Sequence, residues 1–228
     1  MEEKKISVII PAYNEAKNIF SVLSVFQHVE GIGEVIVVND GSTDRTAEIV
    51  SGFSNIHLMD FPENHGKTQA VLKAVREASY PVILLCDADL VNLNSSHLDF
   101  MITTYRQGYD MVIMDKGSQP WVFRNLLQSV PALSGTRILK KDFFESINFH
   151  PTDRFQLEIR INDHFLQHGL SIAIVPGSSI YDPRKYVKYP FFHGVVLDIK
   201  GGLSVLASDG YGSIYKNLRA FRKIRGYL

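Results

Sequence analysis

Two aspartates separated by one residue, Asp87 and Asp89, are the clearest chemical feature of the sequence. They follow the apolar run 82–86, which is typical of a buried strand, so both carboxylates are expected at a strand end outside the sheet. Two carboxylates this close repel each other unless a cation lies between them. Mg²⁺ and Mn²⁺ prefer oxygen ligands and are commonly shared between carboxylates and substrate phosphates. The pair therefore predicts a metal site at which the ion stabilises a diphosphate leaving group.

Polar residues also follow three other apolar runs. Segments 11–15 (Pro-Ala-Tyr-Asn-Glu), 39–44 (Asn-Asp-Gly-Ser-Thr-Asp) and 64–67 (Asn-His-Gly-Lys) each come after a short β-branched stretch. Helix capping accounts for single residues such as Asn14 or Thr43, but not for four polar strand ends. Because ligands of open parallel sheets bind beyond the carboxyl ends of the strands, these segments predict one shared site.

Strands and helices alternate in the first half of the chain, and they must position these groups. Continuous apolar strands separated by helices indicate parallel βαβ units, so we expect an α/β fold with a mostly parallel central sheet and helices on both faces. The expected strands are 6–10, 34–38, 56–59, 82–85 and 111–114, and the expected helices are 15–26, 44–53, 67–78 and 95–107. Further along, we expect a helix over 153–168, a strand over 172–175, and amphipathic helices over 190–207 and 213–225.

Bulk composition limits the classes of partner and compartment. The 228 residues fit one domain, and a formal net charge of zero argues against a nucleic-acid partner. The single cysteine, Cys86, excludes an internal disulfide and suits a reducing compartment. No signal-like segment and no apolar run of about 20 residues is present, so we expect a cytoplasmic protein or one peripheral at the inner face of a membrane. Residues 184–228 hold nine Lys and Arg against two Asp, which indicates weak membrane-surface association or a solvated basic face.

Segments 11–15, 39–44 and 87–89 resemble, in order and spacing, the signature of family-2 glycosyltransferases with the GT-A fold. The resemblance implies an enzyme that transfers a sugar, with inversion, from a UDP- or GDP-sugar donor with the help of Mg²⁺ or Mn²⁺. It implies one domain over 1–228, with a nucleotide-sugar-binding half (1–115), an acceptor half (116–189) and a helical extension (190–228). The donor site it implies contains Pro11, Tyr13 and Glu15 along the nucleotide pocket, Asp40 on the base, and Asp87, Ala88 and Asp89 near the diphosphate, with Asp89 in a catalytic role.

The segment that contains Gly66 and Lys67 resembles the family's Gly-Lys loop near the donor phosphates or ribose. Gly66 permits close backbone approach, and Lys67 at a helix N-terminus suits an anion. A Walker A loop is excluded because Phe61 stands where that motif needs a glycine.

The second half offers acceptor-side candidates. Segment 133–139 resembles the Ser-Gly-x-Arg stretch of polyprenyl-phosphate sugar transferases, and its Arg137 either pairs with a phosphate or forms a structural ion pair. The family resemblance makes Glu158 the first candidate for a general base; with a phosphate acceptor it would only position. The same resemblance makes Asp182 a third metal ligand, with a turn-capping role before Pro183 as the alternative, and places Arg184 over the diphosphate.

Three functions remain open from the sequence. The first is a sugar transferase whose acceptor is a polyprenyl phosphate or a saccharide. The second is a nucleotidyltransferase that makes the nucleotide-sugar, although such enzymes usually have a glycine-rich loop after the first strand. The third is a catalytically inactive nucleotide-sugar-binding module, against which the intact aspartate pair argues.

Overall fold

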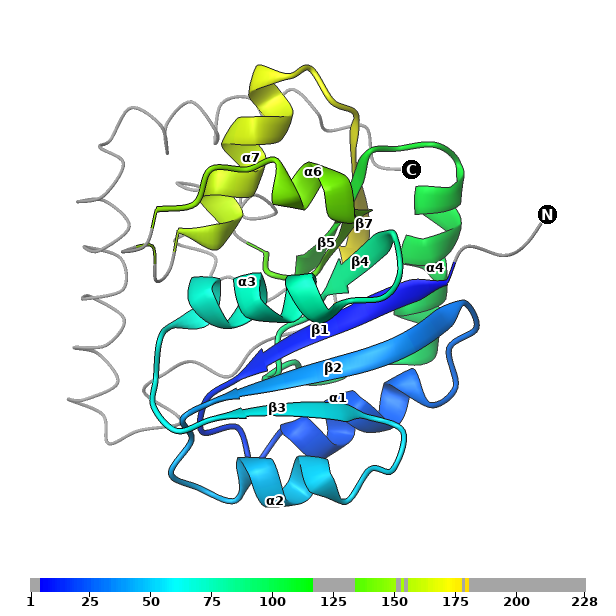
Figure 1. The fold of residues 1–228 in the computed structure, drawn as a ribbon. Helices are drawn as coiled ribbons and strands as arrows, with labels where there is room; N and C mark the ends of the chain where they lie inside the picture. The colour runs from blue at the N-terminus through cyan, green and yellow to red at the C-terminus, as the bar shows by residue number, and fades with distance from the viewer. Residues whose placement is uncertain (1–4, 117–133, 151–152, 154–155, 178, 181–228) are drawn as a thin grey trace, which may run out of the picture.

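The computed structural model describes residues 5–116, 134–150, 153, 156–177 and 179–180. Within this part of the chain, seven strands form one sheet in the order β3-β2-β1-β4-β6-β5-β7 (Figure 1). The strands are β1 (Ile6–Ala12), β2 (Ile32–Asp40), β3 (His57–Phe61), β4 (Val82–Leu85), β5 (Met111–Lys116), β6 (Arg137–Lys140) and β7 (Ile172–Gly177). Strands β1 to β4 pair in parallel, as do β5 and β7, whereas β6 runs antiparallel to both of its neighbours. The mostly parallel sheet predicted from the sequence is confirmed.

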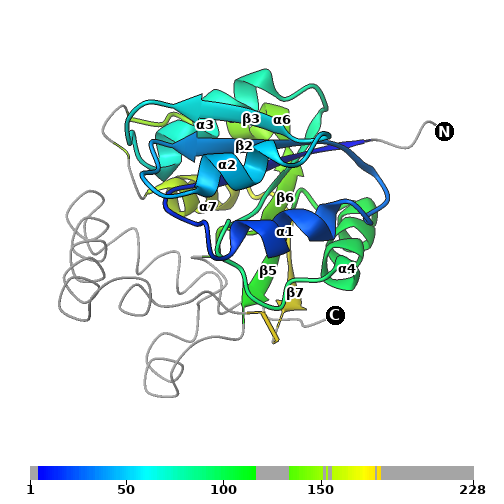
Figure 2. The same ribbon diagram turned by 90° about the horizontal axis from the view of Figure 1, so that it is seen from below.

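Helices cover both faces of this sheet (Figures 1 and 2). They are α1 (Ile19–Phe26), α2 (Thr46–Ser51), α3 (Lys67–Glu77), α4 (Ser95–Arg106), α6 (Lys141–Glu145) and α7 (Leu157–Gln167). Alternate residues of β1 explain the two layers, since Val8 and Ile10 pack with α1, α2 and α4 while Ile9 packs with α3, α6 and α7. A strand buried on both faces must be apolar throughout, which is why the predicted strands read as continuous β-branched runs.

Beyond β5, the helix predicted over 153–168 and the strand predicted over 172–175 correspond to α7 and β7, but the residues before them hold two elements that the sequence pattern does not predict. Strand β6 and helix α6 were not predicted, and β6 lies between β4 and β5, where Arg137 is in register with Leu85 on one side and Ile113 on the other. Because β6 is antiparallel, it begins at the edge where β4 and β5 end. Residues just before Arg137 are thereby brought to the carboxyl edge of the sheet, beside Asp87.

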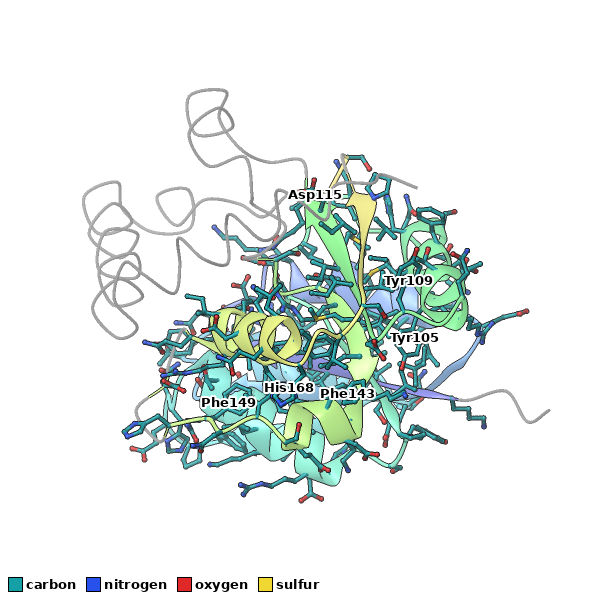
Figure 3. All side chains as sticks on the ribbon, turned by 90° about the horizontal axis from the view of Figure 1, so that it is seen from above. Tyr105, Tyr109, Asp115, Phe143, Phe149 and His168 are labelled. Carbon is teal, nitrogen blue, oxygen red and sulfur yellow. The ribbon has the colours of Figure 1, made fainter. Side chains whose placement is uncertain are left out.

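Several boundaries differ from those predicted. Helix α1 begins at Ile19 instead of residue 15, because residues 15–18 form a turn in which the N–H groups of Asn18 and Ile19 donate to the carbonyl of Glu15. Helix α7 begins at Leu157 instead of residue 153. Its Phe165 meets Phe143 of α6 edge-on at 5.7 Å between ring centroids, and Figure 3 labels Phe143 on this side of the molecule.

The predicted helices 190–207 and 213–225 lie outside the described residues. No helix in the described part of the chain is long and apolar enough to cross a membrane.

Candidate active site

The loops after β1 and β2 hold each other through side chains of the predicted motifs. Asn14 receives a hydrogen bond on Oδ1 from the Thr43 N–H (2.8 Å) and donates its own N–H to Ser42 Oγ (2.9 Å). Its φ of 56° lies in the left-handed region, which Asn tolerates better than most residues. Asp44 accepts from the N–H groups of Ala16 (3.1 Å) and Thr46 (3.0 Å). These motif residues therefore connect the two loops.

Asp40 connects the second loop to the third. Its carboxylate accepts from the N–H groups of His65 and Gly66, both at 2.8 Å, and the residue is only 3% exposed. Gly41 lies against the same loop, with φ of 70°, and a Cβ there would approach the Glu63 carbonyl carbon to 2.5 Å. What the structure shows for Asp40 is this link to the Gly-Lys loop; its contact with a nucleobase stays a prediction.

A network of ion pairs lies at the carboxyl edge of the sheet. Lys67 Nζ, in the first turn of α3, is 2.6 Å from Asp87 Oδ1 and 2.7 Å from Glu158 Oε1 of α7. Lys116 Nζ, at the end of β5, is 2.9 Å from Asp87 Oδ2. The four side chains are between 11% and 27% exposed. We call Lys67, Asp87, Lys116 and Glu158 the charged centre; it joins β4, α3, β5 and α7.

Within the charged centre, charge pairing outweighs the effect of burial on the pKa values of Asp87 and Lys67. Burial alone would raise the pKa of Asp87, but the ammonium groups of Lys116 and Lys67 outweigh it and hold this pKa well below the ordinary 3.8. Burial alone would lower the pKa of Lys67, but Asp87 and Glu158 raise it above the ordinary 10.5. Asp87 and Lys67 are therefore both charged throughout the range between those two values.

Gly135 packs directly on the Lys67–Asp87 pair. A Cβ at this position would lie 2.2 Å from Asp87 Oδ1 and 2.5 Å from Lys67 Nζ. Real side chains do not approach this closely, so any other residue at position 135 would displace one partner of the pair. The glycine of the Ser-Gly-x-Arg stretch is therefore required by packing against this ion pair, in addition to the turn expected from the sequence.

The sequence profile of glycosyl transferase family 2 matches residues 7–168, more than half of the chain and every residue of the charged centre. The chain belongs to glycosyl transferase family 2. The match extends from β1 to the end of α7, so the family assignment rests on the same elements that build the site.

This family-2 chain is similar in sequence to two curated relatives and in structure to one solved enzyme. It is 31% identical over 139 residues to CsbB of Bacillus subtilis (strain 168), covering 57% of this chain and 42% of that protein. It is 32% identical over 123 residues to the undecaprenyl-phosphate 4-deoxy-4-formamido-L-arabinose transferase of Photorhabdus laumondii, covering 48% of this chain and 36% of that one. The chain thus spans less than half the length of either relative.

The solved structure is glucosyl-3-phosphoglycerate synthase from Mycobacterium tuberculosis in complex with Mn²⁺, UDP-glucose and phosphoglyceric acid. It superposes with a TM-score of 0.72 at 21% sequence identity, over 94% of this chain and 80% of that chain. This likeness confirms the predicted GT-A fold of the family-2 chain.

Arg137, predicted to meet a phosphate or to form a structural ion pair, is buried inside the domain of this family-2 chain. Its side chain is 0% exposed and donates to the Ser134 carbonyl (Nε, 3.2 Å) and to Asn162 Oδ1 (Nη1, 3.0 Å). Burial lowers the pKa of the guanidinium to about 10, although Glu158 and Asp87 act in the opposite direction. The guanidinium thus contacts protein groups where β6 inserts between two other strands, and its contact with a phosphate stays a prediction.

The surroundings of Asp87 also bear on the predicted metal site. Asp87 is neutralised by two lysines, so mutual repulsion with Asp89 no longer requires a cation by itself. Among the described residues, no three His, Cys, Asp or Glu side chains gather closely enough to hold an ion. Asp182 and Arg184, predicted for the metal and the diphosphate, lie outside the described residues.

The remaining predicted residues line the same edge. Tyr13 is 42% exposed, Pro11 near the end of β1 and Glu15 after it are partly buried, and Ala88 is buried between the two aspartates. Sequence reasoning missed Lys116 and Asn162. Lys116 follows Asp115, which Figure 3 shows at the end of β5, and a charged residue ending an apolar run was the available signal. Asn162 follows Glu158 by one helical turn, and that spacing was the signal for it.

The link between the first two loops predicts a graded effect at Asn14. Asn14→Ala removes the Oδ1 acceptor of the Thr43 N–H, while the backbone N–H that donates to Ser42 Oγ is kept. Alanine also tolerates the left-handed region less well than asparagine, so we expect a loss of about 1–3 kcal/mol in the free energy of unfolding. Asn14→Gly removes the same acceptor without the conformational cost and should lose less by about 1 kcal/mol. Urea unfolding of the two variants measures this; equal losses would contradict a role for the backbone conformation.

Gly135→Ala should displace the Lys67–Asp87 pair. Overpacking of this kind typically costs about 1–3 kcal/mol in the free energy of unfolding. Because the pKa of Asp87 is lowered in the folded state, its contribution is present above the ordinary value of 3.8 and is lost as the pH falls below it. The stability difference between wild type and Gly135→Ala should therefore narrow as the pH falls below that value.

Gly52→Ala is the matched control, since Gly52 has an ordinary helical conformation and its added Cβ would only touch the Ile49 carbonyl at 3.2 Å. We expect no pH-dependent stability difference for this variant. A pH-independent loss in Gly135→Ala would show that the ion pair survives the substitution.

Proposed function

We propose that this chain transfers a sugar from a UDP- or GDP-sugar to a lipid-linked phosphate, with inversion at the anomeric carbon. Family membership supports the transfer of a sugar. The Mycobacterium tuberculosis enzyme with the same fold, crystallised with Mn²⁺ and UDP-glucose, supports a nucleotide-sugar donor and a divalent ion. The relative that is named an undecaprenyl-phosphate transferase supports a lipid phosphate over a saccharide. The family match also favours this function over nucleotidyl transfer.

The single observation that carries the choice of acceptor is the ion pair between Lys67 and Glu158. A general base must be available to take a proton, but Glu158 Oε1 is held 2.7 Å from Lys67 Nζ, and its protonation would break a largely buried ion pair. A hydroxyl acceptor needs such a base, whereas a phosphate reaches the site already ionised and can attack directly. Glu158 then acts by holding Lys67 in place.

The residues of the site divide the remaining work. Tyr13, exposed after β1, and the Gly-Lys loop held by Asp40 would bind the nucleotide. Lys67 and Lys116 bring positive charge toward the donor diphosphate, and Asp87 keeps both ammonium groups in position. Mg²⁺ or Mn²⁺ held by Asp89 and the donor phosphates would neutralise the leaving diphosphate.

Asp89→Ala tests the metal-dependent part of this proposal. We expect wild-type protein to gain thermal stability with UDP or GDP in the presence of Mn²⁺, and Asp89→Ala to lose the Mn²⁺-dependent part of that gain and nearly all turnover. Asp99→Ala on the exposed face of α4 is the control and should behave as wild type. Near wild-type turnover in Asp89→Ala would refute the metal-assisted mechanism, and absence of turnover by wild type across UDP- and GDP-sugars would favour an inactive binding module.

Glu158→Gln tests the acceptor. With a polyprenyl phosphate acceptor, we expect the variant to keep its turnover number within about tenfold of wild type, because the Gln amide oxygen can still accept from Lys67 Nζ and keep it in place. Loss of a general base would instead typically cost about 10²–10⁴-fold. The control is Glu145→Gln, which removes only the partly exposed Glu145 partner of Lys141 on α6. A loss of about 10²-fold or more, or transfer to saccharides alone, would show that Glu158 is a base and that the acceptor is a hydroxyl.

A further inference from the structure

Helix α7 carries Glu158 into the charged centre, and a second polar side chain of the same helix bears on its orientation. Asn162, one turn further on and on the same face, is 0% exposed and is bonded at Oδ1 by Arg137 Nη1 at 3.0 Å. This bond ties α7 to β6.

The other side of the same guanidinium shapes the turn before β6. Arg137 Nε donates to the Ser134 carbonyl at 3.2 Å, and Nη2 donates to the same oxygen. The bonds close the segment 134–137 upon itself, and Gly135 in its middle lies on the Lys67–Asp87 pair. One buried side chain therefore contacts both supports of the charged centre: the turn that covers Lys67 and Asp87, and the helix that carries Glu158.

We propose that Arg137 is a positioning residue that acts through Asn162 and the Ser134 carbonyl, fixing Glu158 on Lys67 and Gly135 over Asp87. This proposal rests on the proposed function in so far as the charged centre serves sugar transfer. A planar guanidinium is suited to the task because its donors lie on three nitrogen atoms and point in several fixed directions, whereas a lysine presents all its donors at one atom.

A buried arginine is costly, which argues that its bonds matter. Transfer of a charge from water into the protein interior is unfavourable unless hydrogen bonds and nearby opposite charges compensate for the lost hydration. Glu158 and Asp87 both stabilise the protonated guanidinium, so Arg137 also contributes positive charge to the two carboxylates of the charged centre. Removing it would disturb both geometry and charge, and Arg137 variants are therefore poor probes of geometry alone.

The sharper probe is Asn162. Asn162→Leu keeps nearly the same volume but removes the acceptor for Arg137, whereas Asn162→Asp keeps an acceptor at the same place. Ile161→Ala is the matched stability control, because Ile161 is equally buried on the same helix and packs in the core layer that α7 shares with α3 and α6. The measurements are the thermal midpoint, kcat and KM for donor and acceptor, and hydrogen exchange of amides 157–162.

We expect Asn162→Leu to lower kcat by about tenfold to a hundredfold, the scale of a misplaced site, with donor KM changed by less than about threefold. Amide exchange at the start of α7 should become faster. Asn162→Asp should restore kcat to within a few-fold of wild type. Ile161→Ala should lower the thermal midpoint at least as much while leaving kcat within about twofold, as expected for a loss of packing alone.

Two results would overturn the proposal. One is a kcat for Asn162→Leu that falls no further than that of Ile161→Ala, which would make the bond merely structural. The other is unchanged exchange at residues 157–162 in Asn162→Leu, which would show that Arg137 does not fix α7. Hydrogen exchange needs no turnover, so a wild-type protein without transferase activity would refute the proposed function while the proposal for Arg137 is still tested.

Discussion

The ion pairs of Lys67 with Asp87 and Glu158 are the interaction on which the site depends. They join the first turn of α3, the residues after β4 and the start of α7, which is distant in the sequence from the other two. Lys67 is held between two carboxylates in a largely buried place, and removing one member of a buried pair typically costs about 3–5 kcal/mol. Two neighbouring residues support these pairs: Gly135 packs against Lys67 and Asp87, and Asn162, on the helix that carries Glu158, accepts a hydrogen bond from Arg137.

The signature segments of family 2 serve structure as much as chemistry in this chain. Asn14 and Asp44 connect the first two loops, and Asp40 connects the second to the third through backbone N–H groups. Loops at the end of a parallel sheet have no ladder to hold them, so side chains must satisfy their backbone donors. A motif preserved for binding and a motif preserved for loop geometry therefore look alike in the sequence, and only the contacts distinguish them.

Two lysines and two carboxylates make up the charged centre. Lys67 and Lys116 share Asp87, and Arg137 adds positive charge from beneath without reaching the surface. Such an arrangement is suited to an anionic ligand, because an incoming phosphate finds ammonium groups already oriented at low reorganisation cost. In the same arrangement Glu158 Oε1 lies 2.7 Å from Lys67 Nζ, so this carboxylate is engaged in an ion pair.

The sequence by itself determined the layers of the fold and the edge where the site lies. Continuous apolar runs allow only strands buried on both faces, so β1 to β5 and the helices between them followed from pattern, and parallel pairing placed Asp40, Lys67 and Asp87 at one edge. The pattern also predicted α7 and β7. Tertiary structure alone decided β6 and the contacts within the site. Strand β6 has four residues and pairs with strands distant in sequence, so no hydrophobic periodicity along the chain predicts it. Its insertion into the sheet buries Arg137. The partners of Asp87 and Glu158 were likewise undetermined, because ion pairing depends on distances between elements that side-chain spacing along the chain does not encode.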